Sequence, residues 1–396
     1  MSQRVRHPIL VAATVALASL PRVATAQSTA LDTLAIEHAT VLPMDRDTAL
    51  ADHTVLVWQD RIVWVGPSRD ARISGRARRI DARGGFLIPG LADMHVHVDS
   101  VEELAHYLSA GVTTVRVMHG GPQHLEWRAK VASGALVGPT IITAGPPVGQ
   151  GIFRRDARFV PLQTPADADR VVREQVRAGY DMIKIIQRVN VATYQRLVEA
   201  ARVAQVPVVG HVVDNIGLDR ALVAGQVTLE HANGLRQRSW LARLIGGDDA
   251  EALDNDARAI ARADAWVGTI VSPRNGLCDP ATPTTLRTVA ALRRANVKLL
   301  AGTDAGIGPV RAGTSLHCEL ATLVAAGLTP YEALQAATVN AGAFVRLHLR
   351  PPHVPFGTVT VGSRADLLLL SRDPRVDIDA ITAQIAVMVR GVWRPH

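Results

Sequence analysis

Short apolar runs alternate with segments of helical periodicity over most of the chain. Eight runs rich in valine, isoleucine and leucine indicate strands at residues 91–98, 111–118, 139–145, 182–187, 206–212, 226–232, 266–273 and 297–305. Most segments between them repeat apolar residues every three or four positions, which is typical of amphipathic helices. Apolar strands that alternate with helices are typical of a parallel sheet that is buried on both faces.

The number of predicted strands favours a closed architecture. Eight strands, each followed by a connection of helix length, predict a parallel (β/α)8 TIM barrel over residues 89–351, close to the usual size of that fold. A doubly wound open sheet is the alternative, because the connection after the third strand is long and irregular.

Both flanks of this region contain strand-like pieces without strong helix patterns. These pieces lie at residues 53–59, 61–66 and 84–90 on one side and at 356–370 and 386–395 on the other. Each flank alone would leave apolar strands uncovered. We therefore expect one small β-sandwich domain, with residues 27–88 as its first part and residues 352–396 as its second part.

The first 26 residues follow the pattern of a targeting segment. A basic start, MSQRVRHP, precedes the apolar stretch ILVAATVALASL and the small residues Ala24 and Ala26. This order is typical of a cleaved secretory signal peptide. The apolar stretch is short for a membrane span, so we expect a periplasmic or secreted protein with no stable membrane anchor after cleavage. An uncleaved anchor is the alternative.

Composition narrows the classes of partner. The chain has a formal net charge of +7, but its basic residues are scattered and do not alternate with aromatic residues along a stripe. This distribution argues against nucleic-acid binding. The two cysteines, Cys278 and Cys318, allow at most one disulfide bond between them. Composition leaves open whether the chain forms a homo-oligomer.

Six polar residues gather at the carboxyl ends of five predicted strands. They are His95 and His97 on the first, Lys184 on the fourth, His211 on the fifth, His231 on the sixth and Asp304 on the eighth. A single strand histidine is more often a hydrogen-bonded core residue, and a strand-end aspartate often caps the next helix. However, barrel enzymes carry their active site at this end of the strands. The joint pattern therefore predicts a metal centre.

Lys184 has an unusual setting, because it is one of only three lysines beside forty arginines and lies within the apolar run MIKII. A buried, uncompensated ammonium is strongly disfavoured. Carbon dioxide can convert the amine to a carbamate, an anion with two oxygens that can bridge two metals. The ligand types suit two divalent ions, with zinc preferred and manganese, cobalt or iron as alternatives.

Several segments together resemble the amidohydrolase superfamily. They are LIPGLADMHVHV, GYDMIKI, VPVVGHV, VTLEHANG, AGTDAG and the region from LHCELATLVAAGLTP to GTVTVGSRADLLLLSRDP. The closest resemblance is to the branch of imidazolonepropionase-related proteins that includes bacterial Xaa-Pro dipeptidases. This resemblance implies a (β/α)8 barrel with a β-sandwich formed from both chain ends.

The resemblance also implies a role for each ligand. His95 and His97 would bind the more buried metal together with Asp304, His211 and His231 would bind the second metal, and carbamylated Lys184 would bridge them. The implied chemistry is metal-assisted hydrolysis, with Asp304 as the catalytic general base and acid.

The predicted substrate loops depart from the pattern of that branch. Val117 stands where relatives often carry an acid, and the loop after the third strand lacks their Gly-Gly-His sequence. Candidate substrate contacts are Arg116, His119, Tyr194 and His317, and the arginines of the loop after the third strand, which are Arg154, Arg155 and Arg158. The guanidinium of such an arginine could bind a substrate carboxylate through two hydrogen bonds. The alternative is that these arginines lie in a solvated loop and make no fixed contact.

These features predict a hydrolase of a small-molecule amide, most simply a dipeptide or an N-acyl amino acid. A hydrolase of a cyclic amide, a lactone or a carbamate ester would use the same site. A metal-binding or solute-binding barrel without catalysis is the alternative from another class, and the proton-transferring position of Asp304 argues against it.

Overall fold

The computed structural model describes residues 33–150, 158–186, 188–232, 250–271, 278 and 282–396. The predicted signal peptide and the candidate residues Arg154 and Arg155 lie outside these ranges. None of the described helices is long and apolar enough to cross a membrane.

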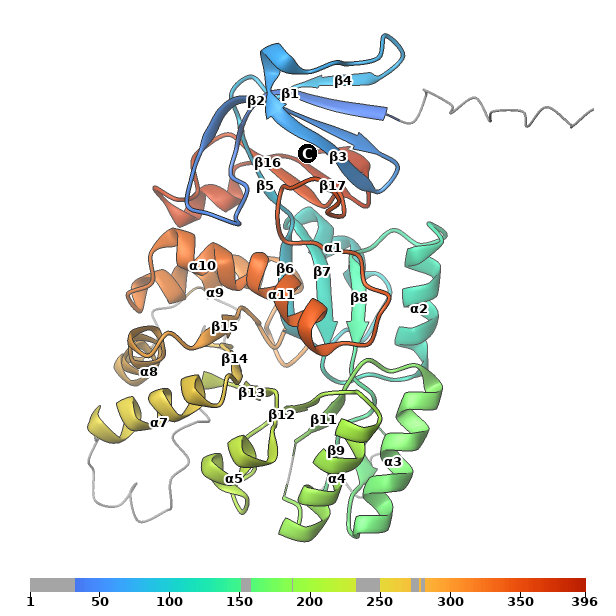
Figure 1. Cartoon of the computed structure of the whole chain (residues 1–396), viewed down its shortest axis with the longest axis vertical. Helices are drawn as coiled ribbons and strands as arrows, with labels where there is room; N and C mark the ends of the chain where they lie inside the picture. The colour runs from blue at the N-terminus through green and yellow to red at the C-terminus, as the bar shows by residue number, and fades with distance from the viewer. Residues whose placement is uncertain (1–32, 151–157, 187, 233–249, 272–277, 279–281) are drawn as a thin grey trace, which may run out of the picture.

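The two chain ends build one sheet together. Its strand order is β18-β17-β16-β5-β1-β2-β3, and β4 also pairs with β1. The strands are β1 (Thr33–Val41), β2 (Leu50–Trp58), β3 (Arg61–Pro67), β4 (Arg78–Asp81), β5 (Phe86–Pro89), β16 (Leu367–Leu370), β17 (Gln384–Val389) and β18 (Val392–Pro395). Figure 1 shows the blue N-terminal strands beside the red C-terminal strands. Strands from both chain ends therefore belong to one eight-stranded sheet, in which β16 pairs antiparallel with β5.

Eight further strands run parallel to one another and form the centre of the second region, which we call the α/β domain. They are β6 (Leu91–Val96), β7 (Val112–Val117), β8 (Thr140–Thr143), β11 (Ile183–Ile185), β12 (Val208–Gly210), β13 (Thr228–Glu230), β14 (Trp266–Gly268) and β15 (Lys298–Leu300). Their buried residues are mostly Val, Ile and Leu, as expected for strands covered on both faces.

These parallel strands belong to two sheets. One contains β6, β7 and β8, and the other runs from β11 to β15 with the short strands β9 (Val148–Gly149) and β10 (Val160–Pro161) at its edge. Single parallel bridges connect the sheets at both sides, between Ala144 and Met182 and between Val96 and Ala305. The eight strands therefore neighbour one another in chain order.

Helices cover the outside of these strands, as Figure 1 shows. They are α1 (Glu103–Ser109), α2 (Pro122–Ala132), α3 (Pro165–Ala178), α4 (Val191–Val203), α5 (Gly217–Ala224), α7 (Ala250–Arg262), α8 (Pro283–Arg294), α9 (Thr314–Ala325), α10 (Pro330–Ala336) and α11 (Val339–His348). Two short 3-10 helices, η1 (Ser68–Asp70) and η4 (Ile378–Thr382), lie beside the sheet of the chain ends. Local signals set their ends: Thr164 caps α3 before Pro165, and Gly179 ends it with a φ of 93°.

A buried ion pair joins the sheet of the chain ends to the α/β domain. Arg364 donates to Asp366 and, across the boundary, to the hydroxyl of Thr114 at 2.6 Å. Asp366 also accepts from the backbone N–H of Arg390 at 2.8 Å. Both charged side chains are less than 10% exposed, at 8% and 3%. Because buried charges are stable only when they are paired, this contact fixes the two regions against each other.

We expect Arg364→Ala to lower the free energy of unfolding by about 3–5 kcal/mol, because it leaves Asp366 buried without its cation. Urea unfolding followed by circular dichroism measures this change. Arg372→Ala, which breaks the exposed pair with Asp377, is the matched control and should cost less than about 1 kcal/mol. Equal losses in the two variants would contradict the proposed importance of burial.

Candidate metal centre

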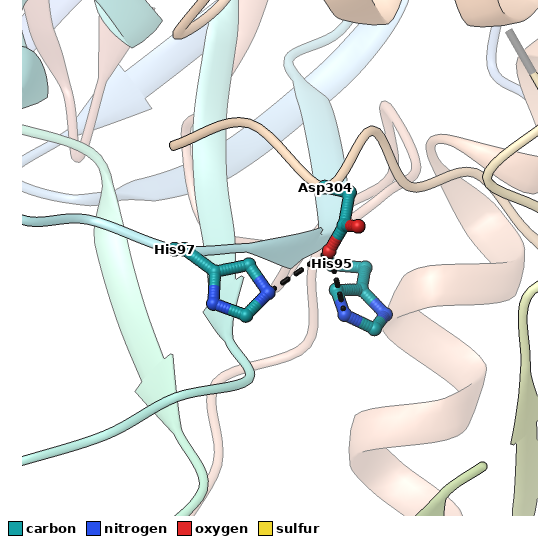
Figure 2. Close-up of side chains that lie close together, drawn as sticks. All are labelled: His95, His97 and Asp304. Atoms are coloured by element: carbon teal, nitrogen blue, oxygen red, sulfur yellow. Dashed lines mark hydrogen bonds and ion pairs between the residues drawn. The ribbon is translucent and has the colours of Figure 1, made fainter. Parts of the chain in front are cut away.

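A pair of histidines and an aspartate lie together at the end of β6. His95 lies within β6 and His97 directly follows it, so both point to the same side. His97 Nε2 lies 2.9 Å and His95 Nε2 lies 3.3 Å from Asp304 Oδ1 (Figure 2). One ligand atom from each of the three residues falls within 4.8 Å of the others, and all three residues are buried.

Lys184, the central residue of β11, extends this group. Its Nζ lies 3.1 Å from His95 Nε2, and the residue is 1% exposed. The amine is therefore buried against the histidines and does not reach the surface as a solvated lysine would.

The remaining two histidines complete one contiguous cluster. His231 follows β13, and its ring centroid lies 5.1 Å from that of His95. His211 follows β12, and its ring centroid lies 4.9 Å from that of His231. The six residues singled out in the sequence, which come from the ends of five strands, thus lie together in the folded chain.

Asp93 is a buried carboxylate that the sequence analysis did not single out, and it helps to position Asp304. Asp93, two residues before His95 on the same face of β6, accepts from the backbone N–H of His95 and of Thr303 and from the Thr303 hydroxyl at 2.7 Å. Asp304 itself has a φ of 64°, a left-handed conformation that is uncommon outside glycine. The contacts of Asp93 hold the backbone immediately before this turn. The alternation of Asp93 with His95 and His97 was the available sequence signal.

A second missed carboxylate contacts His95 directly. Glu230, the last residue of β13, places Oε2 2.8 Å from His95 Nδ1 and accepts from Arg116 Nη2 at 2.8 Å. Both Glu230 and Arg116 have fully buried side chains. The sequence did offer a signal for Glu230, because an acid within the apolar run QVTLEHA is as unusual as the lysine within MIKII.

This geometry corrects the expectation for Arg116. The residue lies within β7 and not in a loop after it, and its guanidinium is occupied by Glu230 and by the carbonyl of Met94. Arg116 is therefore a buried partner of Glu230 in this structure.

Tyr194 and His317 also lie in other surroundings than expected. Tyr194, on α4, is 1% exposed and donates its hydroxyl to Gln226 at 2.8 Å, and Gln226 in turn donates to the carbonyl of His211 at 3.2 Å. His317, on α9, contacts the carbonyl of Ala110 at the end of α1 through Nε2, at 2.9 Å. These contacts support a structural position for both side chains.

His119 is the candidate substrate contact that lies beside the cluster. Its ring centroid is 5.8 Å from that of His97 and 4.7 Å from that of Phe159. His119 Nε2 lies 3.2 Å from the carbonyl oxygen of Arg158, which is itself exposed. His119 and Phe159 therefore border the candidate ligand His97 on one side.

The electrostatics of the cluster fit metal binding. Burial lowers the pKa of His97 and of His211 to about 3 and that of His231 to about 2. These imidazoles are therefore neutral near pH 7, the form in which histidine binds metals. Burial opposes ionisation of Asp304, but hydrogen bonds from His95 and His97 hold its pKa below the usual range.

Two ring nitrogens in the cluster lack ordinary partners. Within the described residues, His97 Nδ1 and His211 Nε2 are buried without a hydrogen-bond partner. Buried polar atoms are nearly always satisfied, so such atoms need an explanation. Neutral imidazoles together with a carboxylate form a donor set that suits a divalent ion such as zinc. The residues present thus fit a metal.

The two cysteines form a disulfide bond with each other. Cys278 lies between β14 and α8, Cys318 lies on α9, and their Cα atoms are 5.0 Å apart. The bridge that the sequence left open is therefore present in the structure.

Comparisons with known proteins identify the family of the chain and agree with its fold. A model of the amidohydrolase family matches residues 86–394. Imidazolonepropionase from Sphingopyxis alaskensis is 26% identical over 360 residues, which cover 82% of this chain and 87% of that protein. A Bifidobacterium longum structure assigned as a prolidase superposes with a TM-score of 0.76 at 25% identity, covering 92% of this chain and 95% of that one. Phenylurea hydrolase B superposes with a TM-score of 0.73 at 25% identity, covering 91% and 96%.

We expect the metal-free protein to lose stability as the pH falls from about 6.5 to about 3. His97, His211 and His231 have lowered pKa values in the folded state, so the unfolded chain binds more protons across this window and acid favours unfolding. Burial raises the pKa of Asp93 to about 7, which acts in the opposite direction but for one group against three. Thermal unfolding of chelator-treated protein between pH 8 and pH 4 measures the effect. An unchanged midpoint would contradict it.

Proposed function

Because the chain belongs to the amidohydrolase family, we propose that it is a binuclear metal-dependent hydrolase that cleaves the amide bond of a dipeptide or an N-acyl amino acid. The family and the relatives of this chain show that it is a hydrolase of carbon–nitrogen bonds that acts on a small molecule. The observation that carries the finer proposal is the single cluster of His95, Lys184 and Asp304 with three further histidines. We also propose that the eight parallel strands close into a (β/α)8 barrel, which the two bridges between their sheets support.

The proposed ligand sets follow the positions of the side chains. His95, His97 and Asp304 would hold one ion, since their ligand atoms lie within 4.8 Å of one another. His211 and His231 would hold the second. Lys184 Nζ, which lies 3.1 Å from His95 Nε2, would bridge the two ions as a carbamate. Zinc is the preferred identity, because neutral imidazole and carboxylate-type oxygens suit it.

Asp304 is the proposed general base and acid. When bound, a pair of divalent ions supplies an acidified water and polarises the substrate carbonyl. Asp304 is ionised near pH 7, because His95 and His97 hold its pKa low, and it can therefore accept a proton at its carboxylate. Asp304 would then give that proton to the leaving nitrogen as the carbon–nitrogen bond breaks. The buried setting of Asp304 keeps the proton from bulk water.

His119 is the substrate contact that the geometry supports best. It lies beside His97 and packs on Phe159, so an apolar substrate group near the scissile bond could rest against this pair of rings. Arg158, at the same edge and exposed, could interact with a substrate carboxylate.

A second candidate is hydrolysis of a cyclic amide, a lactone or a carbamate ester by the same residues. The relatives named imidazolonepropionase and phenylurea hydrolase B favour it, since neither name denotes a peptidase. Such a substrate would not require a free carboxylate.

We further propose that the chain is exported and that its first 26 residues are removed. The disulfide between Cys278 and Cys318 supports this proposal, because such bonds persist mainly in oxidising compartments. Sequencing the N-terminus of protein recovered from a periplasmic extract tests it, and an intact Met1 would argue against cleavage.

We expect the mature protein to hydrolyse members of a dipeptide and N-acyl amino acid library and to lose activity on chelation until zinc is restored. Amidated forms of the best dipeptides should react at least about 10-fold more slowly if a charged group such as Arg158 reads the carboxylate. Equal rates for free and amidated forms would favour the second candidate. If the metal-loaded protein hydrolyses no amide or ester, the proposal that it is an enzyme is wrong.

Two substitutions separate metal holding from proton transfer. Lys184→Ala should lose bound metal and activity, with partial rescue by acetate or propionate, because a short carboxylate can replace the missing bridge. Asp304→Asn should keep much of the metal and lose about 100-fold or more in kcat, since it cannot accept a proton. Metal analysis by emission spectroscopy and steady-state kinetics measure both. Two metals per chain in Lys184→Ala would refute the bridging role.

A further inference from the structure

Arg116, Glu230 and His95 form a continuous buried chain that the reaction proposed above does not use directly. Arg116 Nη2 donates to Glu230 Oε1 at 2.8 Å, and Glu230 Oε2 lies 2.8 Å from His95 Nδ1. The Thr228 hydroxyl donates to Glu230 Oε1 at 2.5 Å. Both carboxylate oxygens of Glu230 are thus hydrogen-bonded, one to a cation and one to a metal-ligating histidine.

The neighbouring strand leaves room for this carboxylate. Gly268, on β14, is the register partner of Glu230 in the parallel pair β13–β14. A Cβ atom at Gly268 would lie 2.1 Å from Glu230 Oε2, much closer than any real contact. Glycine is therefore required here so that the carboxylate can occupy the space between the strands.

The guanidinium of Arg116 is held from two further sides. Its Nε donates to the carbonyl of Met94, and its Cζ lies 5.1 Å from the centroid of the Phe344 ring. Burial of an ion pair is costly unless its hydrogen bonds are well formed, and a hydrophobic pair of similar volume is often at least as stable. The presence of this pair therefore suggests a role other than general stability.

We propose that Arg116 and Glu230 are positioning residues that hold His95 in one tautomer and one orientation, with Nε2 directed at the metal position. In the metal-loaded protein His95 Nδ1–H would donate to Glu230, which leaves the lone pair on Nε2, the nitrogen that faces Lys184 Nζ and Asp304 Oδ1. Arg116 acts through Glu230 by fixing the carboxylate and balancing its charge. This inference rests on the proposed metal-dependent function.

His97 and His211 differ from His95 in this respect. Within the described residues, His97 Nδ1 and His211 Nε2 have no hydrogen-bond partner, whereas His95 Nδ1 has a buried carboxylate. His95 is thus the most preorganised of these three histidines, and we expect the metal position to which it belongs to bind the first ion.

The test measures binding of Co²⁺ to the metal-free full-length protein. Glu230→Gln keeps the shape of the side chain but removes its charge, and its amide N–H groups would oppose Arg116. We expect about 10- to 100-fold weaker binding of the first cobalt ion and a changed visible spectrum of bound cobalt, as for other partners of metal-bound histidines. Competition with a chromogenic chelator gives the affinity.

Two further variants test the same chain by other means. Gly268→Ala retains every charge and should weaken cobalt binding by displacing the Glu230 carboxylate. Arg116→Met should also weaken it, and Arg116→Lys should recover part of the loss because it restores a cation. Combining Arg116→Met with Glu230→Gln should give less than the sum of the single effects, since the arginine acts through the glutamate.

Asp366→Asn is the matched control, because it neutralises a similarly buried carboxylate of an ion pair at the domain boundary. It should lower the urea midpoint of the metal-free protein and leave cobalt affinity within about twofold of the unsubstituted protein. If Glu230→Gln behaves in the same way, the pair is only structural and the inference is wrong. If Glu230→Gln does not fold, unchanged cobalt affinity in Gly268→Ala overturns the inference equally. An unsubstituted protein that binds no cobalt would overturn the metal-dependent function as well, which separates the two failures.

Discussion

The contact of Asp304 with His95 and His97 concentrates ionisable groups in an interior that is otherwise apolar. Removing such groups from water is costly, and the cost is offset only when they satisfy one another or coordinate a cation. Much of the local structure around the cluster serves this condition. Parallel strands end together, so that side chains distant in the chain can meet. Burial lowers the pKa of His97, His211 and His231 and keeps these three imidazoles neutral. Asp93 holds the backbone that carries Asp304 in its left-handed turn. The same constraint explains why a lysine can lie inside an apolar strand.

Two buried carboxylates show how the surroundings determine the state of an acid. Asp93 and Glu230 are both excluded from water. Burial raises the pKa of Asp93 to about 7, and the hydrogen bonds from hydroxyl and backbone N–H groups lower it too little to offset this. Burial acts on Glu230 in the same direction, but Arg116 and His95 outweigh it and hold the pKa of Glu230 below its usual range. One carboxylate therefore secures the backbone before Asp304, and the other presents a full negative charge to His95.

The proposed substrate contacts lie beside the ligand cluster. His119 and Phe159 border the histidines, and exposed Arg158 lies at the edge of this surface. The sheet made from both chain ends is fixed to the α/β domain through Arg364, at Thr114 on β7, the strand that also carries Arg116. Strands and their ends thus supply the candidate ligands, whereas the proposed substrate contacts come from the segments that follow the strands. This division is the usual one in parallel α/β enzymes.

The sequence by itself determined the alternation of strands and helices, the positions of the six candidate ligands at strand ends and the association of both chain ends in one β region. Those features follow from local periodicity and from the rule that parallel strands present their carboxyl ends together. Only the tertiary structure decided which contacts the other buried side chains make. It moved Arg116 from a substrate contact to a partner of Glu230, placed Tyr194 and His317 in structural contacts, and joined Cys278 to Cys318. Glu230 and His95 are 135 positions apart, and Glu230 and Arg116 are 114 apart. No local pattern encodes which buried acid meets which base, because such a contact depends on strand register and on space such as that left by Gly268.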